Sequence, residues 1–229
     1  MLTQTMITES PRRPASKAAR GRPPVEAQPL GGSIELMGAC LSFARNVEIY
    51  GEGETAEYLY KVVSGTVRTS KILADGRCQI GAFYLPGDMF GLEMGEEHTF
   101  SAEAIADAKV LVIKRSAVTA LAQRDSDVAH ELWTLTGREL HRVQEHVLLL
   151  IKTAQERVAG FLLEMAQRER ESNEVELPMS RQDIADYLGL TIETVSRTLT
   201  HLAATAVIEV PSSRRIVLRN RAALARLNG

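Results

Sequence analysis

The chain has few cysteines and no long apolar run. Its 229 residues include only two cysteines, Cys40 and Cys78, which are too few and too far apart in the sequence for a disulfide framework. No stretch approaches the roughly 20 apolar residues that a membrane-spanning helix needs, and residues 1–20 lack the apolar block of a secretion signal. These absences argue against a disulfide-rich secreted domain and a membrane protein. They predict a cytoplasmic protein with free thiols.

An overall excess of basic charge is also missing, because the net charge is −2 at pH 7. Binding to nucleic acid depends on local basic patches and not on the total charge. From Ser180 onward, seven arginines stand against four acidic residues, which leaves a local excess of three positive charges. The C-terminal segment is therefore the basic part of the chain.

Residues 180–202, SRQDIADYLGLTIETVSRTLTHL, contain two short helical patterns separated by a glycine. The apolar positions of the first pattern recur at helical spacing, at Ile184, Tyr187 and Leu188. Ser180 is expected to cap this helix, and Gly189 stands where a left-handed residue would end it. Thr191 is expected to cap the second helix. Caps, turn and apolar spacing together predict a helix-turn-helix, whose main use is reading duplex DNA.

The second pattern separates a buried stripe from an outer face. The buried stripe consists of Val195, Leu199 and Leu202. The outer face near the helix start is expected to read bases in the major groove with Ile192, Glu193, Ser196 and Arg197. Arginine can hold guanine O6 and N7, a carboxylate can accept from cytosine N4, and isoleucine can touch a thymine methyl group.

Other polar residues of this region are predicted to contact the DNA backbone. They are Ser180, Arg181, Thr191, Thr194 and Thr200. The alternative for the whole stretch is a helical hairpin without DNA contact, in which Glu193 and Arg197 form a solvated pair one turn apart. The agreement of caps, turn and stripes favours the helix-turn-helix.

Between Asn46 and Arg115 the composition changes to short runs that favour β-strands. These runs cover residues 58–63, 66–72, 79–85 and 109–113. Ser64-Gly65, Asp75-Gly76 and Pro86-Gly87-Asp88 separate them with typical turn residues. Regular turns between short strands predict an antiparallel barrel or jelly roll.

A long helical signal at residues 116–171 contains a heptad seam. The seam positions are Ala129, Trp133, Thr136, Leu140, Val143, Val147, Leu150 and Ala154. We expect the six positions from Trp133 to Leu150 to form a homodimer interface, because one recognition helix reads only half of a palindrome. The alternative is packing against the β-rich region, which we expect of another face with Leu132, Leu135, Leu148 and Leu149.

The helical signal is expected to break near residues 152–154 and to resume at residues 156–170. After the recognition helix, VIEVPSSRRIVLRN predicts two strands around residues 211–213. This wing would bring Arg214 and Arg215 to the DNA backbone, with plain solvent exposure as the alternative.

Two stretches resemble one family. LGLTIETVSRTL is similar to the recognition-helix signature E-T-V/I-S/G-R of the CRP/FNR superfamily of bacterial transcription regulators. Glu193 and Arg197 match the shared base-reading pair, whereas Ile192 and Ser196 match the FNR-like subgroup. The resemblance implies TTGAT half-sites, not the TGTGA half-sites of the CRP subgroup. Residues 58–93 also resemble the cyclic-nucleotide-binding β-roll of this superfamily.

The resemblance does not imply that the β-roll binds a nucleotide. The nucleotide binders of the family carry an arginine in a G-E-x(n)-R-S/T-A cassette, and residues 91–101, GLEMGEEHTFS, contain none. We therefore expect the nucleotide site to be lost. A metal site could use Glu93, Glu96, Glu97 and His98, but a solvated charged loop is the preferred interpretation.

No other cofactor is expected either. An iron–sulfur cluster like that of FNR takes four thiolates, which two cysteines cannot supply. No paired haem-ligand motif occurs, and no nucleophile, base and orienting group occur together as in an enzyme. We thus predict neither a metal nor a cofactor.

The combined expectation is an α+β protein with a cyclic-nucleotide-binding-like β-roll, a long dimerisation helix and a winged helix-turn-helix. Its parts are a flexible arm (1–32), the β-roll (33–123), the dimerisation helix (124–152) and the DNA-binding domain (153–229). The chain is most similar to the FixK-like branch, which has the FNR-type reading helix without the cysteine cluster.

That branch implies an activator that binds TTGAT-N4-ATCAA as a homodimer, contacts RNA polymerase and needs no effector. Genes of low-oxygen respiration and nitrogen fixation would be its targets. The alternative is a regulator whose β-roll binds a small molecule, haem or metal to switch DNA binding.

Overall fold

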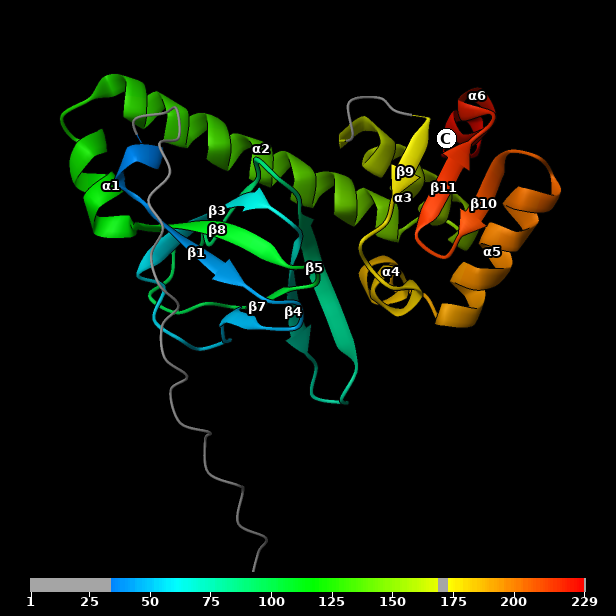
Figure 1. Ribbon diagram of the computed structural model, residues 1–229, viewed down its shortest axis with the longest axis horizontal. Helices are drawn as coiled ribbons and strands as arrows, with labels where there is room; N and C mark the ends of the chain where they lie inside the picture. Colours follow the sequence, from blue (N-terminus) through cyan, green and yellow to red (C-terminus); the bar gives the residue numbers. More distant parts are fainter. Residues whose placement is uncertain (1–33, 169–172, 229) are drawn as a thin grey trace, which may run out of the picture.

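The computed structural model describes residues 34–168 and 173–228 of the chain. The predicted flexible arm, residues 1–32, lies outside the described residues. The described chain has a β-rich half and a helical half, and the long helix α2 (Ser126–Leu150) runs from one to the other (Figure 1). This order of elements confirms the predicted α+β class.

The β-rich half contains two antiparallel sheets of four strands each. Their strand orders are β1-β8-β3-β6 and β2-β7-β4-β5. After a short 3-10 helix, η1 (Glu35–Met37), the strands are β1 (Ala39–Phe43), β2 (Glu48–Tyr50), β3 (Tyr58–Ser64), β4 (Val67–Ile72), β5 (Cys78–Tyr84), β6 (Met89–Phe90), β7 (Ser101–Ala104) and β8 (Ala108–Lys114). A buried cluster joins the two sheets, with Val62 and Val110 from one and Val67 and Ala102 from the other. The predicted β-roll is therefore a closed unit with its own core.

The four predicted strands correspond to β3, β4, β5 and β8, each within one residue at either end. Long apolar runs bounded by turn residues explain this agreement. The turn at Gly65 needs glycine for two reasons: its φ is +80°, and a Cβ there would lie 2.2 Å from the carbonyl oxygen of Asp107. The short strands β1, β2, β6 and β7 were not predicted.

Three helices follow the β-roll: α1 (Arg115–Ala122), α2 and α3 (Ala154–Arg168). The Asp125 side chain caps α2 by accepting hydrogen bonds from the backbone N–H groups of Asp127 and Val128. The predicted break is confirmed, because α2 ends at Leu150 and α3 begins at Ala154. Helix α3 starts two residues earlier than expected, since Thr153 and Glu156 bond each other's backbone N–H groups at 3.4 and 2.6 Å.

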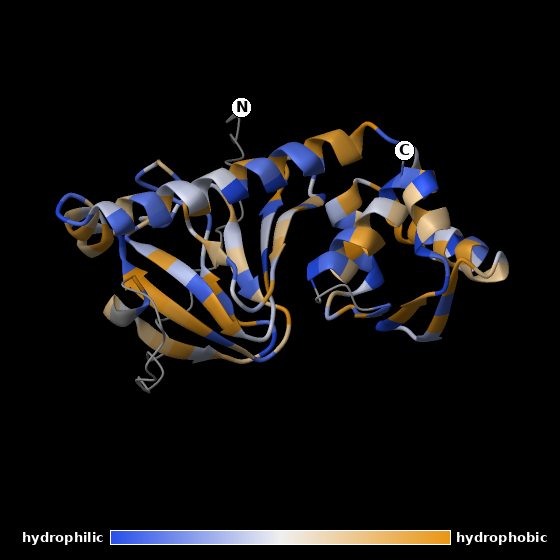
Figure 2. Cartoon of the chain, turned by 90° about the horizontal axis from the view of Figure 1, so that it is seen from above, coloured by the Kyte–Doolittle hydropathy of each residue, from blue (hydrophilic) through white to orange (hydrophobic). Residues whose placement is uncertain are grey.

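The apolar faces of α2 differ along its length. Leu132 and Leu135 pack against the core of the β-roll, as predicted. Leu149 is buried, but in the core of the C-terminal half. The expectation for Leu148 was wrong, since its side chain is 52% exposed. Successive helix residues point about 100° apart, so burying Leu149 turns Leu148 away from the same core. Figure 2 shows hydrophobic residues gathered at this C-terminal end of α2.

The C-terminal half is a winged helix-turn-helix. It consists of β9 (Glu174–Glu176), α4 (Arg181–Leu188), α5 (Ile192–Ala204), β10 (Ile208–Ser212), β11 (Arg215–Leu218) and α6 (Arg221–Asn228). The antiparallel sheet has the order β10-β11-β9, so the predicted wing is completed by a third strand. Helix α6, which was not predicted, packs on α3, and Lys152 Nζ donates to the carbonyl oxygen and to Oδ1 of Asn228.

A further hydrophobic cluster spans the two halves. Phe83 of β5 is buried with Phe161 of α3 and Tyr187 of α4, at ring-centroid distances of 6.3 and 5.2 Å from them. The ring of Tyr187 also stacks on His146 of α2 at 4.2 Å. Burial of these rings fixes how the helix-turn-helix sits on the β-roll. Among the helices of the described residues, none is both long and apolar enough to cross a membrane.

Gly65→Ala is predicted to destabilise the protein more than Gly76→Ala. Both glycines have positive φ, +80° and +84°, which costs an alanine about 1–2 kcal/mol. A Cβ at Gly76 meets no atom within 4 Å, whereas one at Gly65 collides with the backbone of Asp107 and Ala108. We expect a further loss of about 1–3 kcal/mol for Gly65→Ala, measured as the urea midpoint. Equal midpoints would show that the Gly65 turn relaxes freely.

Candidate nucleic-acid interface

Helix α4 is capped at both ends by its own sequence. Ser180 Oγ accepts from the backbone N–H of Asp183 at 3.1 Å, and Asp183 Oδ2 accepts from the N–H of Ser180 at 2.7 Å. Gly189 ends the helix in the left-handed conformation, with φ 62° and ψ 39°. Both predicted caps are confirmed, and together they fix the tight turn before α5.

Helix α5 begins as expected. The Thr191 side chain caps it by accepting from the backbone N–H of Thr194 at 3.3 Å. Its apolar stripe, Val195, Leu199 and Leu202, is buried. The opposite face is therefore free to meet a ligand.

All four predicted base-reading residues lie on this outer face, in the first two turns of α5. Glu193, Ser196 and Arg197 are exposed, and Ile192 is 37% exposed. The Arg197 guanidinium donates to Thr194 Oγ1 at 3.5 Å and projects from the surface. An isoleucine, a carboxylate, a hydroxyl and a guanidinium are thus presented side by side, which is a set that can distinguish base edges.

Glu193 places a negative charge at the start of this helix. Hydrogen bonds from its own backbone N–H and from the Thr191 hydroxyl lower the pKa of the Glu193 carboxyl, and Arg197 adds a smaller effect. The carboxylate is therefore ionised at neutral pH. A carboxylate here repels phosphate, so its favourable partner on DNA is a base amino group.

Four of the five residues predicted to contact the DNA backbone lie at the starts of α4 and α5, and Thr200 lies in the third turn of α5. Their hydroxyl groups have partners within the chain. Thr191 and Thr194 share a hydrogen bond of 3.1 Å between their Oγ1 atoms, and Thr200 Oγ1 donates to the Ser196 carbonyl at 2.9 Å. Ser180 is exposed although its hydroxyl caps α4. The Ser180 hydroxyl accepts in its cap, so it can still donate its hydrogen to a phosphate, whereas the Thr200 hydroxyl already donates within the helix.

Arg181 stands out at the start of α4. Its Nη1 atom is buried and has no hydrogen-bond partner within the described part of the chain, and burial lowers the pKa of Arg181. An uncompensated guanidinium at a helix N-terminus attracts an anion, because its charge adds to the helix dipole. The Nη1 atom itself is out of reach of a DNA phosphate, so any contact would fall to the rest of this half-buried side chain.

The two arginines of the wing differ in their contacts. Arg214 lies in the exposed turn between β10 and β11. Arg215 is also exposed, but its guanidinium forms an ion pair with Glu174 of β9. Arg214 is the better placed of the two for a phosphate, because Arg215 already has a carboxylate partner.

The predicted dimer seam forms an exposed apolar stripe on α2. Trp133 is 78% exposed, Leu140 57%, Val143 49% and Val147 56%. Thr136 is exposed on the same stripe, and Leu150 is half-buried. Sequence reasoning missed Ile151, which is 79% exposed and extends the stripe past the end of the helix. So much exposed apolar surface in one line is typical of an interface.

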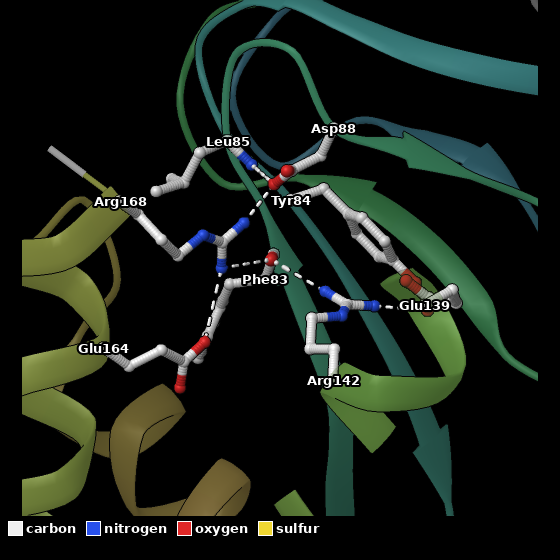
Figure 3. Close-up of polar contacts among 8 residues, drawn as sticks. All are labelled: Phe83, Tyr84, Leu85, Asp88, Glu139, Arg142, Glu164 and Arg168. Atoms are coloured by element: carbon white, nitrogen blue, oxygen red, sulfur yellow. Dashed lines mark hydrogen bonds and ion pairs between the residues drawn. The ribbon is translucent and has the colours of Figure 1, made fainter. Parts of the chain in front are cut away.

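A polar junction connects the β-roll with α2 and α3 (Figure 3). The carbonyl oxygen of Phe83 accepts from Arg142 Nη1 at 3.2 Å and from Arg168 Nη1 at 3.1 Å. Arg168 also pairs with Asp88, and Arg142 pairs with Glu139. Sequence reasoning missed these residues, because Phe83 and Asp88 lie far in the sequence from the arginines that contact them.

A cavity of about 480 Å³ lies between β5, α2 and α4. The guanidinium of Arg142 lines this cavity. It already donates hydrogen bonds to Glu139 and to the Phe83 carbonyl, and it lies 4.4 Å from the ring centre of Tyr84. The carboxylate of Glu93 adds negative charge to the wall. These features disfavour a phosphate, which needs an available cation.

The loop that follows β6 is solvated at Glu96 and Glu97, as expected, but not at His98. His98 is only 2% exposed and stacks on Tyr50 at 3.6 Å, with its Nδ1 3.4 Å from Glu93 Oε2. The imidazole packs against the rings of Tyr50 and Tyr60, and neither of its nitrogens has a hydrogen-bond partner within the described residues. Within the described residues, no three His, Cys, Asp or Glu side chains gather in a group that could hold a metal ion.

Comparisons with known proteins agree with this arrangement. A family model for the Crp-like helix-turn-helix domain matches residues 156–227, and one for the cyclic nucleotide-binding domain matches residues 40–125. The nitrogen fixation regulation protein FixK of Azorhizobium caulinodans is 52% identical over 219 residues, which cover 93% of this chain and 88% of that protein. FixK of Rhizobium meliloti is 40% identical over 181 residues, covering 79% and 82%.

Among solved structures, FixK2 from Bradyrhizobium japonicum matches with a TM-score of 0.80 and 52% identity, covering 84% of this chain and 98% of that one. Fold and reading face thus define a DNA-binding transcription regulator. The chain belongs to the CRP/FNR superfamily and, within it, to the FixK-type regulators. The relatives are regulators and not enzymes, as predicted.

Arg181→Gln is predicted to weaken binding to all DNA sequences alike. Loss of one phosphate contact should lower the slope of log affinity against log salt by about one ion. The measurement is fluorescence anisotropy with random-sequence DNA over a salt series. Arg77→Gln is the control, because Arg77 is 77% exposed on the β4–β5 hairpin and pairs with Asp75. An unchanged slope for Arg181→Gln would assign its guanidinium to the protein interior.

Proposed function

We propose that this protein is a transcription activator that binds the palindrome TTGAT-N4-ATCAA as a homodimer. The observation that supports this proposal best is the outer face of α5, where Ile192, Glu193, Ser196 and Arg197 are exposed beside caps that hold the helix start. The set combines the shared base readers of the superfamily with the two residues of its FNR-like subgroup.

The homodimer follows from the palindrome. One α5 reads one half-site, so two copies related by a two-fold axis are needed for both. The exposed stripe from Trp133 to Ile151 on α2 supplies an apolar surface of the right kind. If two copies of the protein paired along α2, this stripe would be buried between them.

The activator works without a bound effector in this proposal. Support comes from the cavity next to α2, whose guanidinium is already bonded to protein groups and whose wall carries the Glu93 carboxylate. Named relatives regulate nitrogen fixation, and we extend that role, with control of low-oxygen respiration, to this chain. It would act in the cytoplasm, where DNA and RNA polymerase are present, and contact the polymerase.

A second candidate function is favoured by the same cavity. With a volume of about 480 Å³ and contributions from the β-roll, α2 and α4, it can hold a small organic molecule next to the helix-turn-helix. The two candidates differ in what the purified protein does alone. Selection of binding sites from random DNA by effector-free protein should yield the palindrome, whereas a requirement for an added small molecule would favour the ligand-sensing alternative.

Arg197→Ala and Glu193→Ala are predicted to relax base preference in different ways. Arg197→Ala should cost about 1–3 kcal/mol on the palindrome, mainly at the guanine. Glu193→Ala should relax the position whose cytosine it accepts from and raise non-specific affinity, because a negative charge near phosphates is lost. Selected-site sequencing measures base preference, and fluorescence anisotropy measures the affinities for the palindrome and for non-specific DNA.

Glu209→Ala is a matched control for the loss of a carboxylate. Glu209 belongs to the same half but pairs with Arg219 on the wing strands, away from the outer face of α5. Unaltered base preference in both α5 variants, with equal losses of affinity, would show that these side chains only position the helix.

Glutamate at both Leu140 and Val147 is predicted to give monomers. Each change puts a charge into an interface that excludes water, which is strongly unfavourable. Sedimentation velocity should show the smaller species, and affinity for the palindrome should fall far more than affinity for a single half-site. Gln144 is exposed on α2 and is not one of the predicted seam positions, so Gln144→Glu serves as the control. An intact dimer in the double variant would move the interface off this stripe.

A further inference from the structure

Arg68 on β4 joins the β-roll to the helix-turn-helix. Its Nη1 atom forms an ion pair with Asp183 of α4, and its Nη2 atom lies 3.1 Å from Glu103 of β7. Arg68 and Asp183 are 115 residues apart in the sequence. Their side chains are 22% and 12% exposed, so the pair is largely shielded from solvent and from salt.

Asp183 also completes the capping box of α4. Its Oδ2 atom accepts from the Ser180 N–H, whereas its Oδ1 atom accepts from Arg68. One carboxylate therefore holds the first turn of α4 and contacts the β-roll at the same time. The position of that turn relative to β4 is fixed through a single planar group.

The other end of α4 has a separate anchor. Tyr187 packs against Phe83 of β5 at 5.2 Å and stacks on His146 of α2 at 4.2 Å. A helix held at one point can still swing, whereas a helix held near both ends has a defined direction. Removing Arg68 leaves the Tyr187 anchor and frees the first turn.

The contact does not hide the reading face. Asp183 is buried beneath α4, but Glu193, Ser196 and Arg197 remain exposed on α5. The β-roll thus holds the helix-turn-helix from behind. This arrangement can orient the reading helix without blocking it.

Burial by itself would lower the pKa of Arg68, but the carboxylates of Asp183 and Glu103 outweigh burial and raise it. The guanidinium is therefore charged at all physiological pH values. Loss of Arg68 leaves the Asp183 carboxylate with its hydrogen bond to Ser180, so α4 keeps its cap.

We propose that Arg68 is a positioning residue for operator recognition, which selects the spacer between the two half-sites. By holding Asp183 it sets the angle of each helix-turn-helix on its β-roll, and hence the separation of the two reading helices in the dimer. Each added base pair shifts a half-site by about 3.4 Å and turns it by about 35°. A rigid pair of reading helices tolerates one spacer, and a loosened pair tolerates several. This inference rests on the proposed palindrome and homodimer.

The experiment measures affinity for palindromes with spacers from N2 to N6 and for a single half-site, with the full-length protein. The wild type should prefer N4 over N3 and N5 by roughly tenfold or more, a typical size for such coupling. In Arg68→Ala this preference should shrink to within about threefold, while single-half-site affinity stays within about twofold. Arg68→Lys should restore part of the preference, because it returns a cation to Asp183.

Two matched controls separate the contact from general effects on β4. Glu103→Gln removes the other partner of Arg68, and Arg77→Ala removes an ion pair on the same hairpin that does not reach α4. Both should keep the wild-type spacer profile. Asp183→Asn keeps a capping side chain but removes its charge, so it should reproduce the flattened profile even if Arg68→Ala folds poorly.

The outcomes are distinct. An unchanged spacer profile in Arg68→Ala and Asp183→Asn, beside a clear wild-type preference for N4, would overturn the positioning role. So would an equal loss at every spacer, which marks a purely structural residue, or a gain in affinity, which marks an inhibitory contact. A wild type without any spacer preference would instead count against the proposed palindromic recognition itself.

Discussion

The structure depends on one aromatic contact between its halves. Phe83 comes from the β-roll, Phe161 from the first helix of the DNA-binding half and Tyr187 from the helix-turn-helix, and their rings share a buried core. Apolar contact of this kind is strong but has little direction. Arginine pairs around it supply the direction, because a guanidinium binds carboxylates and carbonyls in a defined plane. Core and pairs together make the reading helix part of a rigid body.

The same pairs explain how an acidic protein presents a basic face. Arg68, Arg142 and Arg168 are matched to carboxylates at the junction between the halves, where their charges cancel. Arg214, by contrast, is exposed in the turn of the wing, and Arg181 is half-buried at the start of α4. The net charge of −2 is therefore no measure of the field that DNA would meet. What matters is which cations remain without a neighbouring anion.

Local features of the site could be predicted from the sequence, and long-range ones could not. The caps at Ser180 and Gly189 depend on residues three to five positions away, so their signals lie within one window. The long strands could also be predicted, because apolar runs bounded by turn residues are local signals. The burial of His98 and the contact of Arg68 with Asp183 depend on segments brought together by the whole fold. Leu148 shows a third limit, because periodicity defines the faces of a helix but not what covers each face.

The contact between Lys152 and Asn228 brings the two ends of the DNA-binding half to one place. Lys152 Nζ lies 3.1 Å from Asn228 Oδ1, so the segment from the hinge to α6 forms a nearly closed ring of chain. The chain therefore enters and leaves the DNA-binding half at one place, although Phe83 of the β-roll is buried in the core of that half. A fusion of this half to another protein would need only one junction in the chain, but it would uncover Phe161 and Tyr187. A new partner would have to supply an apolar group in place of Phe83 to keep the reading helix in position.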